Sequence, residues 1–144
     1  MTHNNDFDLR EFLPYLLNQA AEISSQSFQR IYKERYGMLR TEWRVLFHLA
    51  IYQKLTAKEI CQKAMMHKTK VSRAVHRLEA RRYLIRKTDE QDRRHEWLSL
   101  TVQGLAVYED LKSQAEQHDR ALLEKLSAQQ ISVLRSALDV LSQP

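Results

Sequence analysis

The chain has 144 residues, of which 43% are hydrophobic and 28% are charged, and its formal net charge is +5. This composition is typical of one globular domain that is large enough to fold without a metal or a disulfide. The single cysteine excludes an internal disulfide, and the polar start and short apolar runs predict neither a signal peptide nor a membrane span, so we expect a cytoplasmic protein. Two glycines and two prolines argue against Gly-rich phosphate loops and an all-β fold, which indicates a mostly helical protein.

The first part of the chain predicts two helices. Apolar residues recur at helical spacing over residues 9–36, which indicates one long helix with Pro14 in its first turns and Gly37 at its end. Thr41 is expected to cap a second, buried helix that continues to residue 52.

Two shorter helices follow in the middle of the chain. Thr56 and Glu59 have the spacing of a capping box, which predicts a helix that ends near residue 64. A second helix is expected over residues 68–82, with Thr69 as the best candidate for its cap. Four basic residues of this helix are expected to share one outward face: Lys70, Arg73, Arg77 and Arg81.

The last third of the chain predicts a β-hairpin and two more helices. Residues 83–88 and 96–101 have the pattern of two strands joined by a charged run. Thr101 is expected to cap a helix over residues 102–126, in which Gly104 is merely tolerated. A second capping box, Ser127-Ala-Gln-Gln, begins the final helix.

The positive charge is concentrated in the centre of the chain. Residues 58–94 contain 12 Lys and Arg and five Asp and Glu, whereas the rest of the chain has more acidic than basic residues. Such a block is typical of a surface that binds a polyanion, although composition alone is equally compatible with a solvated helical face.

The order of the predicted elements favours one motif. A short capped helix, a brief turn, a basic helix and a charged hairpin form a winged helix-turn-helix, whose second helix enters the major groove of DNA. Several strings at matching separations resemble the MarR family of bacterial regulators: Val71-Ser-Arg-Ala-Val-His-Arg-Leu-Glu79, Asp92-Arg-Arg94, Leu98-Ser-Leu-Thr101 and Gly104, with residues 37–46 and 126–134 extending the likeness over nearly the whole chain.

The chain departs from the family pattern at two points. The family usually has a glycine after the recognition helix, where this chain has Arg82, and a positive φ would cost an arginine about 1 kcal/mol. His67 and Lys68 replace the Asp or Pro that begins the recognition helix in the family.

The resemblance implies a mainly α fold with a small β-hairpin wing. It implies one domain over residues 1–144, with a winged helix-turn-helix at 41–101 and dimerisation helices at 8–36 and 102–144. A palindromic operator requires two recognition helices, so a homodimer is expected. The candidate interface residues, some of which can instead pack within the subunit, are Leu9, Phe12, Leu16, Leu122, Leu123, Leu134, Leu138 and Leu141.

Double-stranded DNA with a pseudo-palindromic operator is the partner that the resemblance implies. The recognition helix then contributes base contacts from Thr69, Lys70, Ser72 and Arg73 and phosphate contacts from Lys68 and Arg77. In the wing, Arg94 matches the family arginine that enters the minor groove, Asp92 orients it, and Arg93 is a phosphate candidate.

The resemblance also implies a small-molecule effector. Trp43 matches an aromatic residue that lines the effector crevice in the family, Phe47 lies one turn later, and Arg73 is a candidate partner for a ligand carboxylate. The plain alternative is that both aromatic residues belong to the core. Cys61 is expected to be a small buried residue, and the sequence indicates no catalytic constellation, no cofactor and no metal site.

The sequence therefore favours a dimeric, sequence-specific transcriptional regulator, a repressor of a nearby operon that a small lipophilic or phenolic or aromatic-acid effector releases. Two alternatives remain: a ligand-independent winged-helix activator or silencer, and a basic helical adaptor for RNA or an acidic protein. The operator, the regulated genes and the sign of regulation do not follow from the residues.

Overall fold

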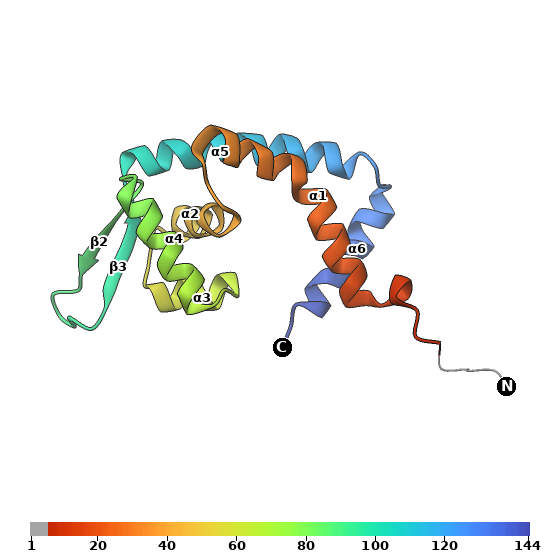
Figure 1. Cartoon of the computed structure of the whole chain (residues 1–144), viewed down its shortest axis with the longest axis horizontal. Coiled ribbons are helices and arrows are strands. Elements are labelled where there is room, and N and C mark those ends of the chain that lie inside the picture. The colour runs from red at the N-terminus through yellow and green to blue at the C-terminus, as the bar shows by residue number, and fades with distance from the viewer. Residues whose placement is uncertain (1–5) are drawn as a thin grey trace.

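A computed structural model describes residues 6–144, which form a mainly helical molecule with a small sheet at one end (Figure 1). The helices are η1 (Leu9–Glu11, a 3-10 turn), α1 (Leu13–Tyr36), α2 (Arg40–Tyr52), α3 (Ala57–Ala64), α4 (Lys68–Ala80), α5 (Val102–Leu123) and α6 (Ala128–Leu141), and the strands are β1 (Lys54–Leu55), β2 (Leu84–Thr88) and β3 (Glu96–Leu100). The mainly α fold with a small β wing is thereby confirmed.

Three helix starts have the caps that the sequence predicts. Thr56 and Ser127 each accept a hydrogen bond from the backbone N–H three residues later, and the side-chain oxygens of Glu59 and Gln130 accept from the backbone N–H of the cap residue. The Thr101 hydroxyl accepts from the N–H of Gly104. These contacts satisfy backbone donors that the first turn of a helix leaves free.

Two predicted caps were wrong. Thr41 lies inside α2, and the helix is instead closed by Glu42, whose carboxylate accepts from the N–H of Leu39 at 3.0 Å. Thr69 lies inside α4, and the imidazole of His67 accepts from the N–H of Thr69 at 3.2 Å. In both cases the chain becomes helical earlier than the threonine, because a neighbouring side chain already satisfies the free donor.

The three strands form one antiparallel sheet in the order β1-β3-β2. The hairpin β2–β3 was predicted, whereas the two-residue strand β1 was missed because it is too short to show an alternating pattern. Leu98 lies opposite both Leu55 and Arg86, and its buried side chain faces the helices. Residues 97 and 99 therefore lie on the other face of β3.

The buried core lies almost wholly within the winged helix-turn-helix and the helix ends that pack on it. Leu46 of α2, Ile60 of α3, and Val71 and Leu78 of α4 are completely buried. Leu111 of α5 is equally buried and joins α5 to the same core. Apolar burial of this kind is the main source of the fold's stability and fixes the relative positions of α3, α4 and the wing.

The turn between α4 and β2 has a demanding backbone. Arg82 stands where the family usually has glycine and has a φ of 64°, so the turn keeps the left-handed conformation, and its carbonyl accepts from the Thr101 hydroxyl at 2.6 Å. Gly104 packs so closely on this turn that a Cβ would lie 1.9 Å from the carbonyl oxygen of Tyr83. Gly104 is accommodated in the first turn of α5, as expected, and the close contact adds a requirement that the sequence does not show, because no side chain fits there.

The terminal helices leave their apolar faces uncovered. No residue of α6 is buried, and Leu134, Leu138 and Leu141 are 40–55% exposed. Leu9, Phe12 and Leu16, at the start of the chain, are 40–47% exposed, whereas Leu122 and Leu123 are half-buried. Among the helices of residues 6–144, none is sufficiently long and apolar to cross a membrane.

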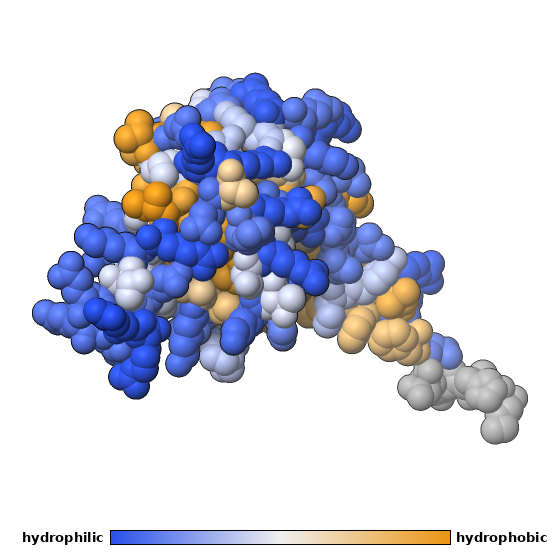
Figure 2. Space-filling view, turned by 60° about the vertical axis from the view of Figure 1, so that its left-hand side comes forward, coloured by the Kyte–Doolittle hydropathy of each residue, from blue (hydrophilic) through white to orange (hydrophobic). Residues whose placement is uncertain are grey.

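Figure 1 shows why these faces remain uncovered: the first half of α1 and all of α6 extend away from the winged part of the molecule. Figure 2 shows hydrophobic side chains at the surface near the N-terminal end, where the rings of Phe7 and Phe12 are in edge contact. The face that carries the wing, at the left of the same view, is mainly hydrophilic.

Candidate nucleic-acid interface

The recognition helix α4 presents polar side chains to solvent over its first two turns. Val71, Ala74, Val75 and Leu78 point into the core, so the residues between them face outward. The exposed residues at the start of α4 are Lys68, Thr69, Lys70, Ser72 and Arg73. Within residues 6–144, Arg73 makes neither a side-chain hydrogen bond nor an ion pair, which leaves its guanidinium available to an incoming ligand.

Arg77 lies between solvent and a buried acid. One Nη atom of Arg77 is 3.9 Å from a carboxylate oxygen of Glu42, and Glu42 is completely buried in α2. The other carboxylate oxygen of Glu42 has no hydrogen-bond partner among the described residues. Because a buried charge requires a partner, this pair ties the middle of α4 to α2, while the Arg77 side chain remains 55% exposed.

Arg81 does not belong to the outward basic face, contrary to the expectation from its spacing. Its guanidinium donates to the carbonyl oxygens of Tyr36 and Gly37 at the end of α1. Arg81 is the C-cap residue of α4, where the helix has ended and the side chain is free to turn toward α1. Helical spacing predicts a shared face only while the helix continues.

At the tip of the wing, Asp92 holds Arg94 in a fixed geometry. The backbone N–H and the Nε of Arg94 donate to one carboxylate oxygen at 3.1 and 3.0 Å, and its Nη2 donates to the other at 3.2 Å. These bonds hold the pKa of Asp92 below its ordinary value. The Arg94 side chain remains 89% exposed, so a preoriented cation projects from the wing.

Two adjacent hollows are lined by residues of α3, α4 and the wing, so these elements share one surface. One, of about 570 Å³, lies between Lys58 and Cys61 of α3, Lys68 and Ser72 of α4, and Arg86 of β2. The other, of about 330 Å³, is lined by Lys58 and Arg86 together with Arg94, His95 and Glu96 of the wing. Lys58 and Arg86 line both hollows, so cations follow one another from α4 to the wing tip.

Sequence reasoning missed Lys58, Arg86 and His95 as parts of this surface. Arg86 also joins the wing to α4, because its Nε donates to Glu79 at 2.9 Å and its Nη1 donates to Glu96 at 3.1 Å. The excess of basic residues over 58–94 was the available signal, but only the packing of β2 against α4 brings these cations together.

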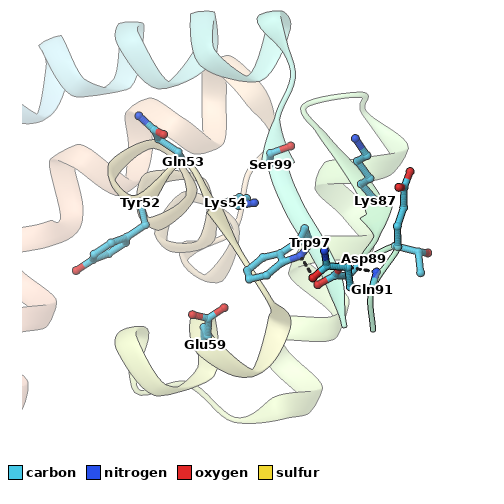
Figure 3. Close-up of a pocket in the computed structure, with 11 residues that line it drawn as sticks. Tyr52, Gln53, Lys54, Glu59, Lys87, Asp89, Gln91, Trp97 and Ser99 are labelled. Carbon is cyan, nitrogen blue, oxygen red and sulfur yellow. Dashed lines mark hydrogen bonds between the residues drawn. The ribbon is translucent and has the colours of Figure 1, made fainter. Parts of the chain in front are cut away.

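The opposite face of the sheet has a different character (Figure 3). A hollow of about 870 Å³ is lined by residues of both signs, among them Lys54, Glu59, Lys87 and Asp89. The ammonium of Lys54 lies over the ring of Trp97, whose indole N–H donates to Asp89 at 3.4 Å. This face therefore carries charges of both signs, whereas the surface on the other side of the sheet is mainly basic.

The predicted effector residues Trp43 and Phe47 contact each other, whereas Arg73 has no direct contact with them. Trp43 and Phe47 are partly buried, and their ring centroids are 5.2 Å apart in an aromatic cluster that includes Phe28 and Tyr108. Arg73 lies on the exposed face of α4 and makes no hydrogen bond, ion pair or ring contact with any described member of that cluster.

Cys61 is half-buried and lines the hollow between α3 and α4, so it is less enclosed than expected. Across residues 6–144 no three His, Cys, Asp or Glu side chains come together in a way that could hold a metal ion. His118 instead joins α5 to α1. Its ring nitrogens lie 2.9 Å from the Ser27 hydroxyl and 2.6 Å from the Ser24 carbonyl oxygen.

Comparisons with known proteins agree with this geometry. Residues 36–95, which include α2, α3, α4 and most of the wing, match the model of the MarR family. An uncharacterized HTH-type transcriptional regulator of Bacillus cereus is 31% identical over 112 residues, which are 78% of this chain and 64% of that protein. The chain therefore spans somewhat less than two thirds of that relative.

Two solved structures are similar over nearly the whole chain. The MarR family transcriptional regulator of Silicibacter pomeroyi is 29% identical with a TM-score of 0.81, and the match covers 95% of this chain and all of that one. BpsR of Bordetella bronchiseptica, whose DNA binding is regulated by 6-hydroxynicotinic acid, shares the fold at 21% identity, with a TM-score of 0.87 and coverage of 97% and 99%. Residues 36–95 thus match the MarR family model, and nearly the whole chain shares the fold of a MarR-family regulator.

Proposed function

We propose that this protein is a homodimeric, sequence-specific DNA-binding transcriptional regulator. The observation that carries the proposal is the continuous basic surface from the exposed start of α4, past Lys58 and Arg86, to Arg94 at the wing tip. A helix of this polarity fits the major groove of DNA, and an extended arginine fits the narrower minor groove beside it.

In this proposal Lys70 and Arg73 read base edges, with Thr69 and Ser72 as hydroxyl contacts to bases or phosphates. Lys68, Arg77 and Arg93 contact phosphate, and Arg94 enters the minor groove in the orientation that Asp92 holds. The exposure of these side chains supports the assignment.

Self-association follows from the uncovered apolar faces of the terminal helices. We assign residues 8–36 and 102–144 to dimerisation and residues 41–101 to DNA binding. An exposed face that contains Leu134, Leu138 and Leu141 is costly for a soluble protein, and the same face of a second copy can cover it.

The regulatory part of the proposal is a repressor that a small phenolic or aromatic acid releases from DNA. Its support is the likeness in fold to BpsR and the aromatic cluster around Trp43 and Phe47. A ligand-independent regulator is distinguished by titration: benzoate-type and hydroxyaryl acids then leave the affinity for DNA unchanged.

The first test is a mobility-shift titration of the purified protein against the DNA upstream of its own gene. Excess nonspecific competitor and salt at about 150 mM suppress binding that depends on charge alone. A competitor-resistant complex with two protein chains per DNA supports the proposal. Equal binding to the promoter and to RNA or random DNA contradicts sequence-specific recognition and favours a basic adaptor.

A further inference from the structure

Arg81 connects the recognition helix to the end of α1. Its Nη1 donates to the carbonyl oxygen of Tyr36, and its Nη2 donates to that of Gly37 at 3.2 Å. These two carbonyls end α1, where a cation is favoured by the helix dipole. Gly37 lies beneath the guanidinium, since a Cβ there would be 3.2 Å from Nη2, and its φ of 60° is also one that glycine adopts freely.

The other side of the same turn is held by the start of α5. The N–H of Thr101 donates to the carbonyl oxygen of Tyr83 at 3.0 Å, and the hydroxyl of Thr101 donates to the carbonyl oxygen of Arg82. Gly104 allows α5 to lie directly against Tyr83. Residues 81–83 are thus fastened both to the helix that enters the winged part and to the helix that leaves it.

A third contact holds those two helices together. Arg35 of α1 donates to both carboxylate oxygens of Asp110 in α5, at 2.8 and 3.0 Å, and the hydroxyl of Tyr36 donates to the same carboxylate. The end of α1 and the first half of α5 therefore form one platform, and Arg81 anchors the C-terminal end of α4 to it.

We infer that Arg81 is a positioning residue that sets the orientation of α4 relative to α1 and α5, and thereby the separation of operator half-sites that two copies of the protein accept. The inference rests on the proposed function. Since α1 and α5 belong to the segments assigned to dimerisation, the direction of α4 in each copy depends on its attachment to them. Arg81 acts through this attachment and not by contacting DNA, because its guanidinium lies against the end of α1, where Nη1 and Nη2 each donate to a carbonyl oxygen.

The test uses DNA that the full-length protein enriches from a random-sequence pool. Affinities are measured for one half-site alone, for two half-sites at the selected separation, and for two half-sites moved closer or farther by about two base pairs, out of about 10 per helical turn. The proteins are the wild type, Arg81→Ala, Arg81→Lys and, as a control, Arg73→Ala. Thermal unfolding of each variant is measured in parallel.

Wild-type protein should bind the selected separation several-fold more tightly than the altered ones. Arg81→Ala should lose most of this preference while its affinity for a single half-site stays unchanged. Arg81→Lys keeps the charge but not the planar fork that reaches two carbonyls, so it should lose a part of the preference. Arg73→Ala should instead weaken all DNAs by a similar factor.

Two results would overturn the inference. If Arg81→Ala weakens half-site and full-site binding alike and lowers the slope of log affinity against log salt by about 1, then Arg81 contacts phosphate. If all affinities fall in proportion to a lower unfolding temperature, then its role is stability alone. Failure of the wild-type protein to enrich any sequence would contradict the proposed function itself, and the inference with it.

Discussion

The winged part of the molecule and the terminal helices differ in how completely their apolar side chains are buried. In the winged part, helices α2, α3 and α4 and the sheet enclose completely buried residues such as Leu46, Ile60 and Leu78. In α6 no residue is buried, although the spacing of its leucines is as regular. The same helical spacing thus marks a buried core in the winged part and an exposed apolar face in α6. A second copy of the protein would cover that face.

Two Asp-x-Arg motifs also have the same local structure in different surroundings. Asp8 and Arg10, near the start of the chain, repeat the geometry of Asp92 and Arg94, with the same three hydrogen bonds at 3.0, 3.0 and 3.3 Å. Hydrogen bonds from the arginine lower the pKa of the aspartate in both places. The local pairing is therefore a product of the Asp-x-Arg sequence, and the surroundings decide whether it can serve DNA binding.

A charge placed on the terminal apolar face should have the largest effect. Leu138→Glu puts a carboxylate into the proposed dimer interface of both copies, at a cost of several kcal/mol, or roughly 10²-fold or more in the dimer dissociation constant. Sedimentation analysis should show monomers, and operator binding should be lost. The helix content, measured separately, should be unchanged. Ser136→Glu adds the same charge to an exposed polar position of α6 and should leave the dimer intact. A dimeric Leu138→Glu protein would show that this face is not the interface.

In the winged part, the largest effect is expected at the contact between α5 and the turn 81–83. Gly104→Ala places a methyl group 1.9 Å from the Tyr83 carbonyl oxygen, and α5 must shift to relieve the overlap. We expect a loss of about 2 kcal/mol in the free energy of unfolding, measured by urea denaturation. Gln103→Ala, at the exposed neighbouring position, should stay within about 0.5 kcal/mol. An unchanged Gly104→Ala protein would contradict the close approach.

The paired motifs provide a matched test of the wing. Arg94→Ala should weaken operator binding by about 1–3 kcal/mol and relax sequence preference at the minor-groove positions. Arg10→Ala removes an arginine with the same local hydrogen bonds and should leave the affinity unchanged. Competition titrations with specific and random DNA measure both, and equal losses in the two variants would argue for a general charge effect.

The smallest effect concerns the brace between α1 and α5. Hydrogen bonds from Tyr36 and Arg35 hold the pKa of Asp110 below its ordinary value, while burial and the contact with Asp110 raise the pKa of Tyr36 to about 12. A lowered carboxyl pKa adds stability above the unfolded value of about 4, and this stability disappears as the pH falls through the folded value.

Asp110→Asn should therefore be less stable than the wild type at pH 7, by about 1 kcal/mol or less because the pair is partly exposed. The difference should close as the pH falls below 4. Urea unfolding at several pH values measures it, with Asp119→Asn, at the looser 3.9 Å pair with Arg135, as the control. A difference that persists in acid would assign the loss to packing instead of charge.

Much of the local structure follows from short-range chemistry. The capping boxes at Thr56 and Ser127 and the helix end at Gly37 were predicted, because each depends on residues within a few positions along the chain. The order of elements and the charged hairpin similarly indicated a winged helix-turn-helix before any packing was known, and the resemblance of several sequence strings indicated the family.

The errors in prediction arose where a distant or unexpected partner intervened. Arg81 has the spacing of the outward basic face, but the carbonyls of α1 capture it. The sequence indicates only that Gly104 is tolerable in the first turn of its helix, whereas the backbone of Tyr83 occupies the space that a side chain would need. Arg86 and Lys58 joined the basic surface only when β2 and α3 were placed beside α4. Such contacts join residues far apart in the chain, so no local pattern contains them.

By itself, the sequence determined the helices, three of their caps, the hairpin, the central block of positive charge and the family likeness, because propensity, periodicity and charge act locally. The tertiary structure decided which apolar faces are buried and which remain open. It also decided which cations form one surface and which of them, like Arg81, are held inside the fold. These outcomes depend on the packing of α1, α4, α5 and the sheet against one another, and burial and long-range hydrogen bonding arise only from that packing.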